Sequence, residues 1–207
     1  HSSHERELRQ QIVKTVRRAV ERYLMISTEG VMSARVDGSS FVISPTGMDR
    51  GSLEMSDLVL IKDGKREKDK LPSRSVRLHR AIYEAHPNIN CVITAQCPNI
   101  LAYAVTCTRL DTRTIPESYV LLRDVQMVSY GTQFERPQQI AKLLSANSPV
   151  ILIQNDAVLT TGTTILQAFD RLEVAEATAK ALLDIANIGR RVPIAREELE
   201  ELERAFF

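Results

Sequence analysis

The sequence is poor in histidine. Its 207 residues include four histidines, and two of these, His1 and His4, stand at the extreme N-terminus. We expect the other two, His79 and His86, to be packing or surface residues. This shortage argues against any metal or acid–base site that needs several imidazoles.

Cysteines and long apolar runs are also scarce. The three cysteines, Cys91, Cys97 and Cys107, form no CxxC spacing, and their odd number argues against a disulfide framework or a typical zinc ribbon. We expect reduced, mostly buried thiols in a cytoplasmic protein. No apolar run approaches the roughly 20 residues of a membrane span, and the charged N-terminus does not resemble a signal peptide.

The charge is nearly balanced, with 27 Lys and Arg against 26 Asp and Glu. We therefore expect neither a nucleic-acid partner nor a membrane-surface partner. The length favours one compact domain, placed at residues 5–207 because no linker rich in Gly or Pro divides the chain. Residues 1–4 are expected to be a tag remnant or a disordered N-terminus.

Hydrophobic periodicity predicts both helices and strands. Helices are expected at residues 5–26, 73–85, 98–105, 137–145, 163–188 and 195–205. Strands are expected at 33–36, 41–44, 57–61, 91–96, 150–153 and 158–161, with a solvated loop at 62–70 and short strands and loops over 108–134. Because the strands cluster rather than alternate strictly with helices, the predicted fold is a three-layer α/β/α sandwich with a mixed, largely antiparallel central sheet.

No GxGxxG, Walker A, GxSxG or HExxH motif is present. Instead, short blocks recur in a specific order, at residues 30–35, 43–47, 70–75, 91–96, 154–159 and 166–173. In order and spacing these blocks resemble the class II aldolase and adducin family, over about residues 8 to 188. The best-known members of that family are fuculose-phosphate aldolases.

The resemblance implies a single α/β/α domain, usually in a homotetramer with active sites at subunit interfaces. It also implies a sugar-phosphate substrate and a zinc ion, which holds the enediolate formed when a glutamate deprotonates dihydroxyacetone phosphate. A divalent cation suits this chemistry because it stabilises the charge that develops on the enediolate oxygens. Three imidazoles leave coordination positions open for the substrate.

The family's catalytic positions hold other residues in this chain. Its HxH pair falls on Thr94 and Gln96, its third histidine on Asp156, and its base glutamate on Ser75. No catalytic residue is therefore intact and no zinc is expected, because neutral oxygens are poor zinc ligands and one carboxylate holds Mg²⁺ only with help from water or phosphate. Cys97 should point to the opposite face of its strand.

The family's phosphate-binding loops are better preserved. Their positions hold Gly30, Thr46, Gly47 and Ser73, and Arg74 replaces a second serine. Arg74 could bond a phosphate at the helix start, or it could fill the emptied pocket and pair with Asp156. Tyr119 matches a family tyrosine that reaches the neighbouring subunit's site, although a tyrosine in a strand-rich stretch is often simply half-buried.

Three functions remain open. We favour a catalytically degenerate homologue that binds a sugar phosphate or acts as a scaffold. It is expected to be a homo-oligomer, with the family's tetramer as the expected form. The first alternative is an active aldehyde-lyase of the L-fuculose-1-phosphate aldolase type, giving dihydroxyacetone phosphate and an aldehyde with a relocated or non-zinc site. The second is a purely structural, self-associating module.

Overall fold

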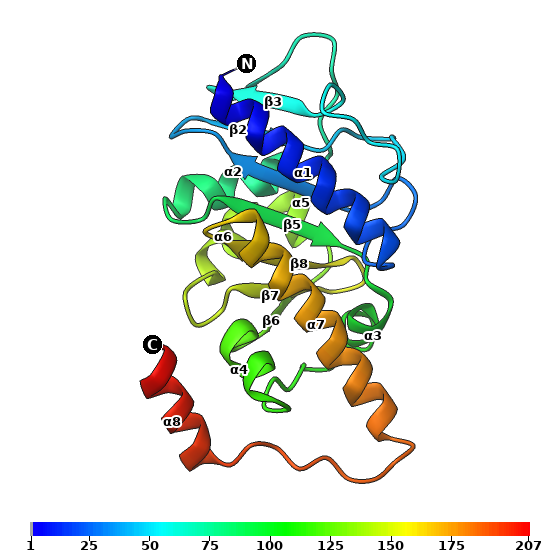
Figure 1. Cartoon of the computed structure of the whole chain (residues 1–207), viewed down its shortest axis with the longest axis vertical. Coiled ribbons are helices and arrows are strands. Elements are labelled where there is room, and N and C mark those ends of the chain that lie inside the picture. Colours follow the sequence, from blue (N-terminus) through cyan, green and yellow to red (C-terminus); the bar gives the residue numbers. More distant parts are fainter. Residues whose placement is uncertain (1) are drawn as a thin grey trace.

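The computed structural model describes residues 2–207 and is built around an eight-stranded sheet (Figure 1). Its strand order is β4-β3-β2-β1-β5-β8-β7-β6. The strands are β1 (Val31–Arg35), β2 (Ser40–Ile43), β3 (Val59–Lys62), β4 (Lys65–Arg66), β5 (Cys91–Ala95), β6 (Gln126–Val128), β7 (Val150–Ile153) and β8 (Ala157–Gly162). All neighbouring pairs are antiparallel except β6 and β7, which are parallel. The predicted mixed, largely antiparallel sheet is confirmed.

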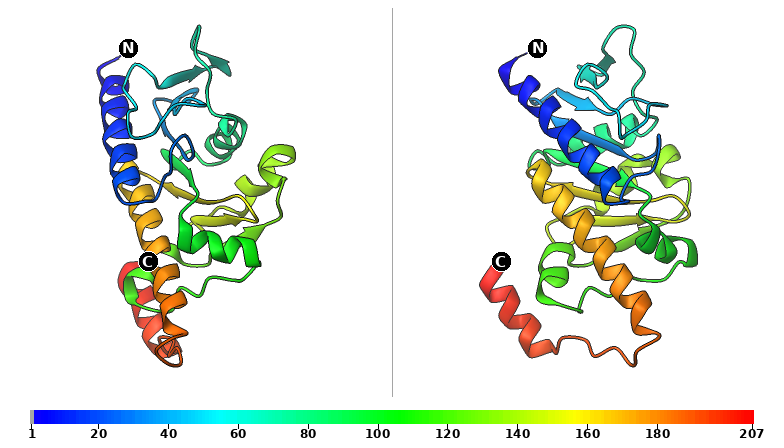
Figure 2. Two further views of the ribbon diagram at one scale, coloured as in Figure 1. Left: turned by 90° about the vertical axis from the view of Figure 1, so that its right-hand side faces the viewer. Right: turned by 45° about the vertical axis from the view of Figure 1, so that its right-hand side comes forward.

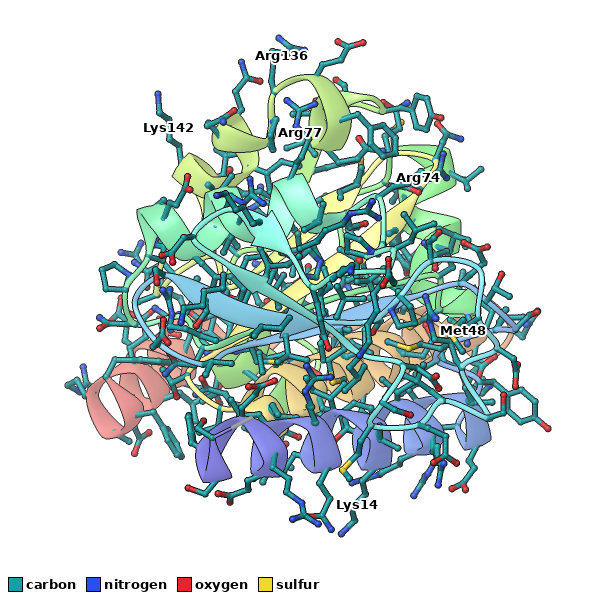
Figure 3. All side chains as sticks on the ribbon, turned by 90° about the horizontal axis from the view of Figure 1, so that it is seen from above. Lys14, Met48, Arg74, Arg77, Arg136 and Lys142 are labelled. Carbon is teal, nitrogen blue, oxygen red and sulfur yellow. The ribbon has the colours of Figure 1, made fainter. Side chains whose placement is uncertain are left out.

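Helices cover both faces of this sheet. One layer contains α1 (Ser3–Glu21), α3 (Pro98–Thr106) and α7 (Ile165–Ile185), and the other contains α2 (Val76–Ala85), α5 (Thr132–Glu135) and α6 (Pro137–Leu143). Figure 2 shows α1 and α7 along one side of the sheet. In the end-on view of Figure 3, Lys14 marks that outer layer, whereas Arg77 and Lys142 mark the opposite one. The remaining two helices, α4 (Pro116–Leu122) and α8 (Arg196–Phe206), lie together at the end of the molecule farthest from the N-terminus.

Strand alternation divides the core into two clusters. In β5, Cys91, Ile93 and Ala95 pack toward α1 and α7. Val92 belongs to the second cluster, toward α2 and α6. Both faces are apolar because helices cover both of them, and successive side chains of a strand point to opposite faces. The same alternation directs Thr94 toward the α2 layer.

Several boundaries differ from the prediction. Residues 2–4, assigned from the sequence to a tag remnant or a disordered N-terminus, form the cap and first residues of α1, with the Glu5 N–H donating to Ser2 Oγ at 3.1 Å. His1 lies outside the described residues. The 62–70 stretch is not only a solvated loop, because it contains β4 and because the half-buried Glu67 carboxylate accepts a 3.1 Å hydrogen bond from Arg9.

The 108–134 stretch holds two helices that were not predicted, α4 and α5. Both are short, and α4 begins with Pro116 at its first position, where proline is tolerated because that N–H has no helical acceptor. With seven and four residues, they are too brief to show helical periodicity.

Among the described residues, no helix combines the length and apolar content that a membrane span requires. The three cysteines are free, as expected, and two of them, Cys91 and Cys97, are buried, whereas Cys107 is exposed.

Both predicted structural histidines pack against the fold. His86 Nε2 lies 2.6 Å from the Ala141 carbonyl oxygen. His79 is fully buried, with Nδ1 2.7 Å from Ser33 Oγ, which lies 2.7 Å from Tyr83 Oη as well. Burial lowers the pKa of His79 to about 3. The imidazole is therefore neutral at neutral pH and serves packing.

The neutral state of His79 predicts acid sensitivity of the fold. Below about pH 6.5 the unfolded chain takes up a proton at this histidine that the folded chain does not, so the free energy of unfolding falls by about 1.4 kcal/mol per pH unit. His79→Gln should be less stable than the wild type at pH 7, and this difference should shrink by about 2 kcal/mol at pH 5. Urea denaturation at both pH values measures it.

The matched control is Tyr83→Phe, which alters the same hydrogen-bonded cluster without adding or removing a group that titrates in this range. Its stability difference from the wild type should be the same at both pH values. A His79→Gln difference that is equally independent of pH would contradict a buried, neutral imidazole.

Candidate functional site

The residues predicted for the site meet in one cavity of about 320 Å³. It lies where the end of β5, the turn before β8 and the start of α2 come together. Its lining includes every predicted position except Tyr119, namely Gly30, Thr46, Gly47, Ser73, Arg74, Ser75, Thr94, Gln96 and Asp156. Positions spread over more than 120 residues of sequence thus share one space.

The floor of the cavity is set by the pairing of β5 with β8. Ala95 pairs with Val158 in antiparallel register, which brings Gln96, just after β5, close to Asp156, just before β8. Thr94 and Gln96 both line the cavity. Cys97, by contrast, is buried in the core beneath α1 and α7, with Sγ 3.4 Å from the Leu24 carbonyl oxygen, as strand alternation predicts.

This floor does not fit a zinc ion. Zinc sites in proteins use imidazole, thiolate or carboxylate ligands, whereas Thr94 and Gln96 offer only neutral oxygens and Asp156 is the single carboxylate in the three positions. The part of the chain that the structure describes has no group of three His, Cys, Asp or Glu side chains placed to hold a metal. We therefore derive no chemical step through a metal.

The charge at Asp156 is disfavoured by its surroundings. Burial raises the pKa of this carboxyl, and the nearby Glu29 carboxylate raises it further. A hydrogen bond from Gln133 Nε2 at 2.8 Å and the positive charge of Arg74 act in the opposite direction without reversing the shift. An imidazole in place of this carboxyl, or a metal beside it, would change these influences on the charge at position 156.

The position predicted for the family's base glutamate also holds a group that is a poor base. Ser75 is the N-cap of α2, and its own N–H donates to Ser73 Oγ at 3.2 Å. A serine hydroxyl holds its proton at neutral pH, so without a neighbouring base it cannot take a proton from a carbon acid.

The loops predicted to form the phosphate site are tied together by backbone hydrogen bonds. The Thr46 N–H donates to the Leu71 carbonyl and the Ser73 N–H to the Ser44 carbonyl, each at 3.1 Å. These two N–H groups are thus already hydrogen-bonded, so Thr46 and Ser73 could donate to a ligand only through their hydroxyls. The arrangement fixes the loop after β2 against the loop before α2.

Three other backbone N–H groups in these loops remain available. Within residues 2–207, those of Gly30, Gly47 and Arg74 donate to no acceptor. Gly30 has a φ of +93°, and a Cβ there would lie 2.7 Å from Met25 Cγ, so only glycine fits. Unpaired N–H groups next to a helix N-terminus form a site suited to an anion.

Arg50 joins the two loops that carry these N–H groups, and no pattern in the sequence pointed to it. The side chain is only 2% exposed. Its guanidinium donates to three carbonyl oxygens, those of Gly30 at 2.7 Å and of Pro45 and Met48 at 2.9 Å. Arg50 therefore joins the loop at Gly30 to the loop that contains Gly47.

Arg74 lies exposed at the rim of the cavity. Its guanidinium carbon is 5.9 Å from the centre of the Phe134 ring. The described residues include no ion pair between Arg74 and Asp156, which is one of the two roles that the sequence left open. Figure 3 shows Arg74 on the same side of the molecule as Met48, which lies in the loop after β2. The guanidinium is therefore placed to meet a ligand from outside.

Gln133 is a site residue that the sequence did not reveal. It comes from α5, one of the unpredicted helices, and is 5% exposed. Its Nε2 donates to Asp156 Oδ2 at 2.8 Å, whereas its Oε1 has no hydrogen-bond partner among the described residues. The buried Oε1 of Gln96 is unpaired in the same way.

Tyr119 does not join the other predicted residues within this chain. It lies on α4, and its hydroxyl donates to Glu203 of α8 at 2.5 Å. The Arg123 guanidinium stacks on its ring at 5.2 Å. Tyr119 lines a separate cavity of about 620 Å³ near the C-terminal helix.

Known proteins similar to this chain are found by sequence over most of its length. The family model described as "Class II Aldolase and Adducin N-terminal domain" matches residues 10–183. The L-fuculose phosphate aldolase of Methanococcus vannielii is 27% identical over 175 residues, covering 82% of this chain and 92% of that protein. The L-fuculose phosphate aldolase of Escherichia coli K12 is 27% identical over 202 residues, covering 92% and 89%.

Solved structures match over nearly the whole chain. The structure of YgbL from Escherichia coli has a TM-score of 0.86 at 22% identity and covers 96% of this chain and 98% of that one. A structure of L-fuculose 1-phosphate aldolase has a TM-score of 0.85 at 23% identity and covers 100% and 97%. At these identities the structural matches establish the fold alone.

Proposed function

Since the chain belongs to the class II aldolase and adducin family, we propose that it retains the family's phosphate site and has lost its metal-dependent aldol cleavage. The protein is then a sugar-phosphate-binding homologue of the fuculose-phosphate aldolases, acting as a sensor or scaffold. The observation that carries the proposal is the contrast within one cavity. Its anion-binding loops are assembled, whereas its metal and base positions hold Thr94, Gln96, Asp156 and Ser75.

The loss of cleavage follows from the chemistry that the family reaction requires. A carbon acid beside a carbonyl loses its proton only when a base takes it and when positive charge stabilises the enediolate. The serine at position 75 cannot act as the base, and Thr94, Gln96 and Asp156 bring no positive charge to a developing enediolate. Both requirements fail at the same place.

Retention of phosphate binding is supported by three features of the cavity mouth. The N–H groups of Gly30, Gly47 and Arg74 are unpaired within the described residues, the N-terminus of α2 adjoins them, and the Arg74 guanidinium stands at the rim. Charge-assisted bonds from arginine to phosphate are among the stronger hydrogen bonds in proteins. A phosphate ester bound at these loops would direct its carbon skeleton toward the floor of the cavity.

We extend the proposal to assembly and location. A homo-oligomer, with the family's tetramer as the expected form, would cover the apolar side chains that α4, α8 and the segment between α7 and α8 expose, among them Ile115, Val192 and Phe206. It would also allow Tyr119 to approach a neighbouring site. Three free thiols suit the reducing cytoplasm.

A thermal-shift experiment tests the proposed function. In the presence of a chelator, L-fuculose 1-phosphate at about one hundred times its Kd should stabilise the protein by about 2.7 kcal/mol, which corresponds to a Tm increase of about 5–10 °C. Free L-fuculose should have little effect because it lacks the phosphate. Arg74→Met should weaken the shift, whereas Arg77→Met, on the outer surface of α2, serves as the matched control.

Two results would contradict the proposal. One is zinc-dependent release of dihydroxyacetone phosphate from L-fuculose 1-phosphate at a rate well above background, which would support the active-lyase alternative. The other is the absence of any Tm change with sugar phosphates, which would support the purely structural alternative.

A further inference from the structure

A second cavity, outside the candidate site, is lined by four arginines. It has a volume of about 620 Å³ and lies between the loop before α4, the end of α4 and the segment that follows α7. Its arginines are Arg109, Arg113, Arg123 and Arg191, and we call it the arginine cavity. Among the described residues, its lining shares no member with that of the cavity at Arg74.

Positive charge exceeds negative charge in the arginine cavity. Against four guanidiniums the lining holds two carboxylates, those of Asp111 and Asp124, so its formal net charge is +2 (4 − 2). Asp111 serves two of the arginines, because its Oδ2 lies 2.7 Å from Arg113 Nη2 and 2.5 Å from Arg191 Nη1. One carboxylate cannot neutralise two guanidiniums, so an uncompensated positive charge remains beside it.

The arginines keep N–H groups that a ligand can reach. A guanidinium carries five N–H donors. Within residues 2–207, Arg109 donates to an aspartate of the lining through one nitrogen and Arg113 through two. The side chains of Arg109, Arg113 and Arg191 are 78%, 47% and 37% exposed. Their remaining donors therefore face solvent in the free protein and are available to an anion.

Arg123 contributes a fixed guanidinium to the same cavity. Its side chain is 12% exposed and lies over the rings of Phe207 and Tyr119, at 4.0 Å and 5.2 Å from their centres. Its Nη2 donates to Asn147 Oδ1 at 3.1 Å. Glu203 of α8, 3.6 Å from its Nη1, stands outside the lining of the cavity. Because this guanidinium is held in place before a ligand arrives, binding costs less conformational entropy.

We propose that the arginine cavity binds a ligand that carries a pyrophosphate group. Guanidiniums form paired, charge-assisted hydrogen bonds with phosphate oxygens. Two linked phosphates supply the negative charge that the lining lacks, and they reach guanidiniums on different walls of the cavity. The volume of about 620 Å³ is typical of a site for a small organic ligand and exceeds what one phosphate fills.

The proposed oligomer does not require this cavity to close. The apolar residues named for that interface, Ile115, Val192 and Phe206, are outside its lining. Val192 lines a separate groove with Ile194 and Leu202. A partner subunit that covers the apolar groove therefore leaves the charged cavity as a distinct surface.

Isothermal titration calorimetry of the full chain with inorganic pyrophosphate tests the inference. In about 0.1 M salt with a chelator, the wild type should bind it with a Kd of about 100 µM or lower. Arg113→Gln and Arg191→Gln should each raise this Kd about tenfold, because each removes charge-assisted hydrogen bonds. The matched control is Arg204→Gln, which removes an exposed charge of α8 outside the lining and should change the Kd less than about twofold.

A variant of the first site distinguishes the two cavities. Arg74→Met should leave the pyrophosphate Kd within about twofold of the wild type, and in this variant orthophosphate should bind at least about tenfold more weakly than pyrophosphate. If Arg113→Gln or Arg191→Gln prevents folding, as seen by circular dichroism, Arg109→Gln makes the same test with a side chain that is 78% exposed.

Four results would overturn the inference. They are a wild type that does not bind pyrophosphate, equal Kd values in the cavity variants and Arg204→Gln, loss of pyrophosphate binding in Arg74→Met, and equal affinities for orthophosphate and pyrophosphate. None of them bears on stabilisation by L-fuculose 1-phosphate. The proposed function and the arginine cavity therefore stand or fall separately.

Discussion

Micromolar or tighter zinc binding, equivalent to about −8 kcal/mol, is the expected result of combining Thr94→His, Gln96→His, Asp156→His and Ser75→Glu. Three imidazoles at these positions would converge because β5 directs Thr94 and Gln96 to one face and because the pairing of β5 with β8 brings Asp156 beside them. Three histidines with an open fourth position are an established zinc-binding set. About one zinc ion per chain should remain after dialysis.

The measurement is elemental analysis of the purified variant, with circular dichroism to establish that it folds. The wild type and the pair Thr94→His with Gln96→His are the controls, and the pair should bind more weakly because it lacks the ligand at position 156. A quadruple variant that folds and stays free of metal would show that the family's metal positions have been assigned to the wrong residues.

A loss of about 3 kcal/mol or more in the free energy of unfolding is the expected effect of Arg50→Met. The substitution keeps much of the aliphatic volume but leaves the carbonyl groups of Gly30, Pro45 and Met48 without their donor. For a chain of this length the loss corresponds to a Tm decrease of about 6–12 °C. Binding of inorganic phosphate should be lost as well, because the loops are no longer joined.

The matched control is Arg17→Met. Arg17 also donates to a backbone carbonyl, that of Leu53 at 2.9 Å, but its side chain is 45% exposed and water can replace the bond. Its substitution should cost less than about 1 kcal/mol. Arg50→Lys should fall between the two, since an ammonium cannot satisfy three separated carbonyls. Equal stabilities of the Arg50→Met and Arg17→Met variants would refute the role assigned to Arg50.

The sequence was sufficient wherever a property depends on local pattern. Alternation along residues 91–97 correctly separates Thr94 from Cys97, because side-chain direction in a strand follows from its period of two. The clustering of strands indicates an antiparallel sheet covered by helices, and the order of the short blocks indicates the family. The blocks also identify the residues that share the 320 Å³ cavity.

The tertiary structure decided what depends on distant partners. Arg50 is an ordinary loop residue in the sequence, and only the approach of two loops gives its guanidinium three carbonyls. Gln133 belongs to a four-residue helix, which is too short to show a hydrophobic periodicity in the sequence. Its place in the site follows from its contact with Asp156. Tyr119 was expected among strands and instead lies on α4 against Glu203.

Which residues stand at the positions predicted for the family's metal ligands is thus a property of the sequence, because it follows from the residues of the blocks. What those residues present to a ligand is not, because hydrogen-bonding capacity is consumed by neighbours that the fold supplies. Thr46 and Ser73 lose their N–H groups to the opposite loop, whereas Gln96 and Gln133 keep unpaired oxygens. Only the folded chain determines which donors and acceptors remain free.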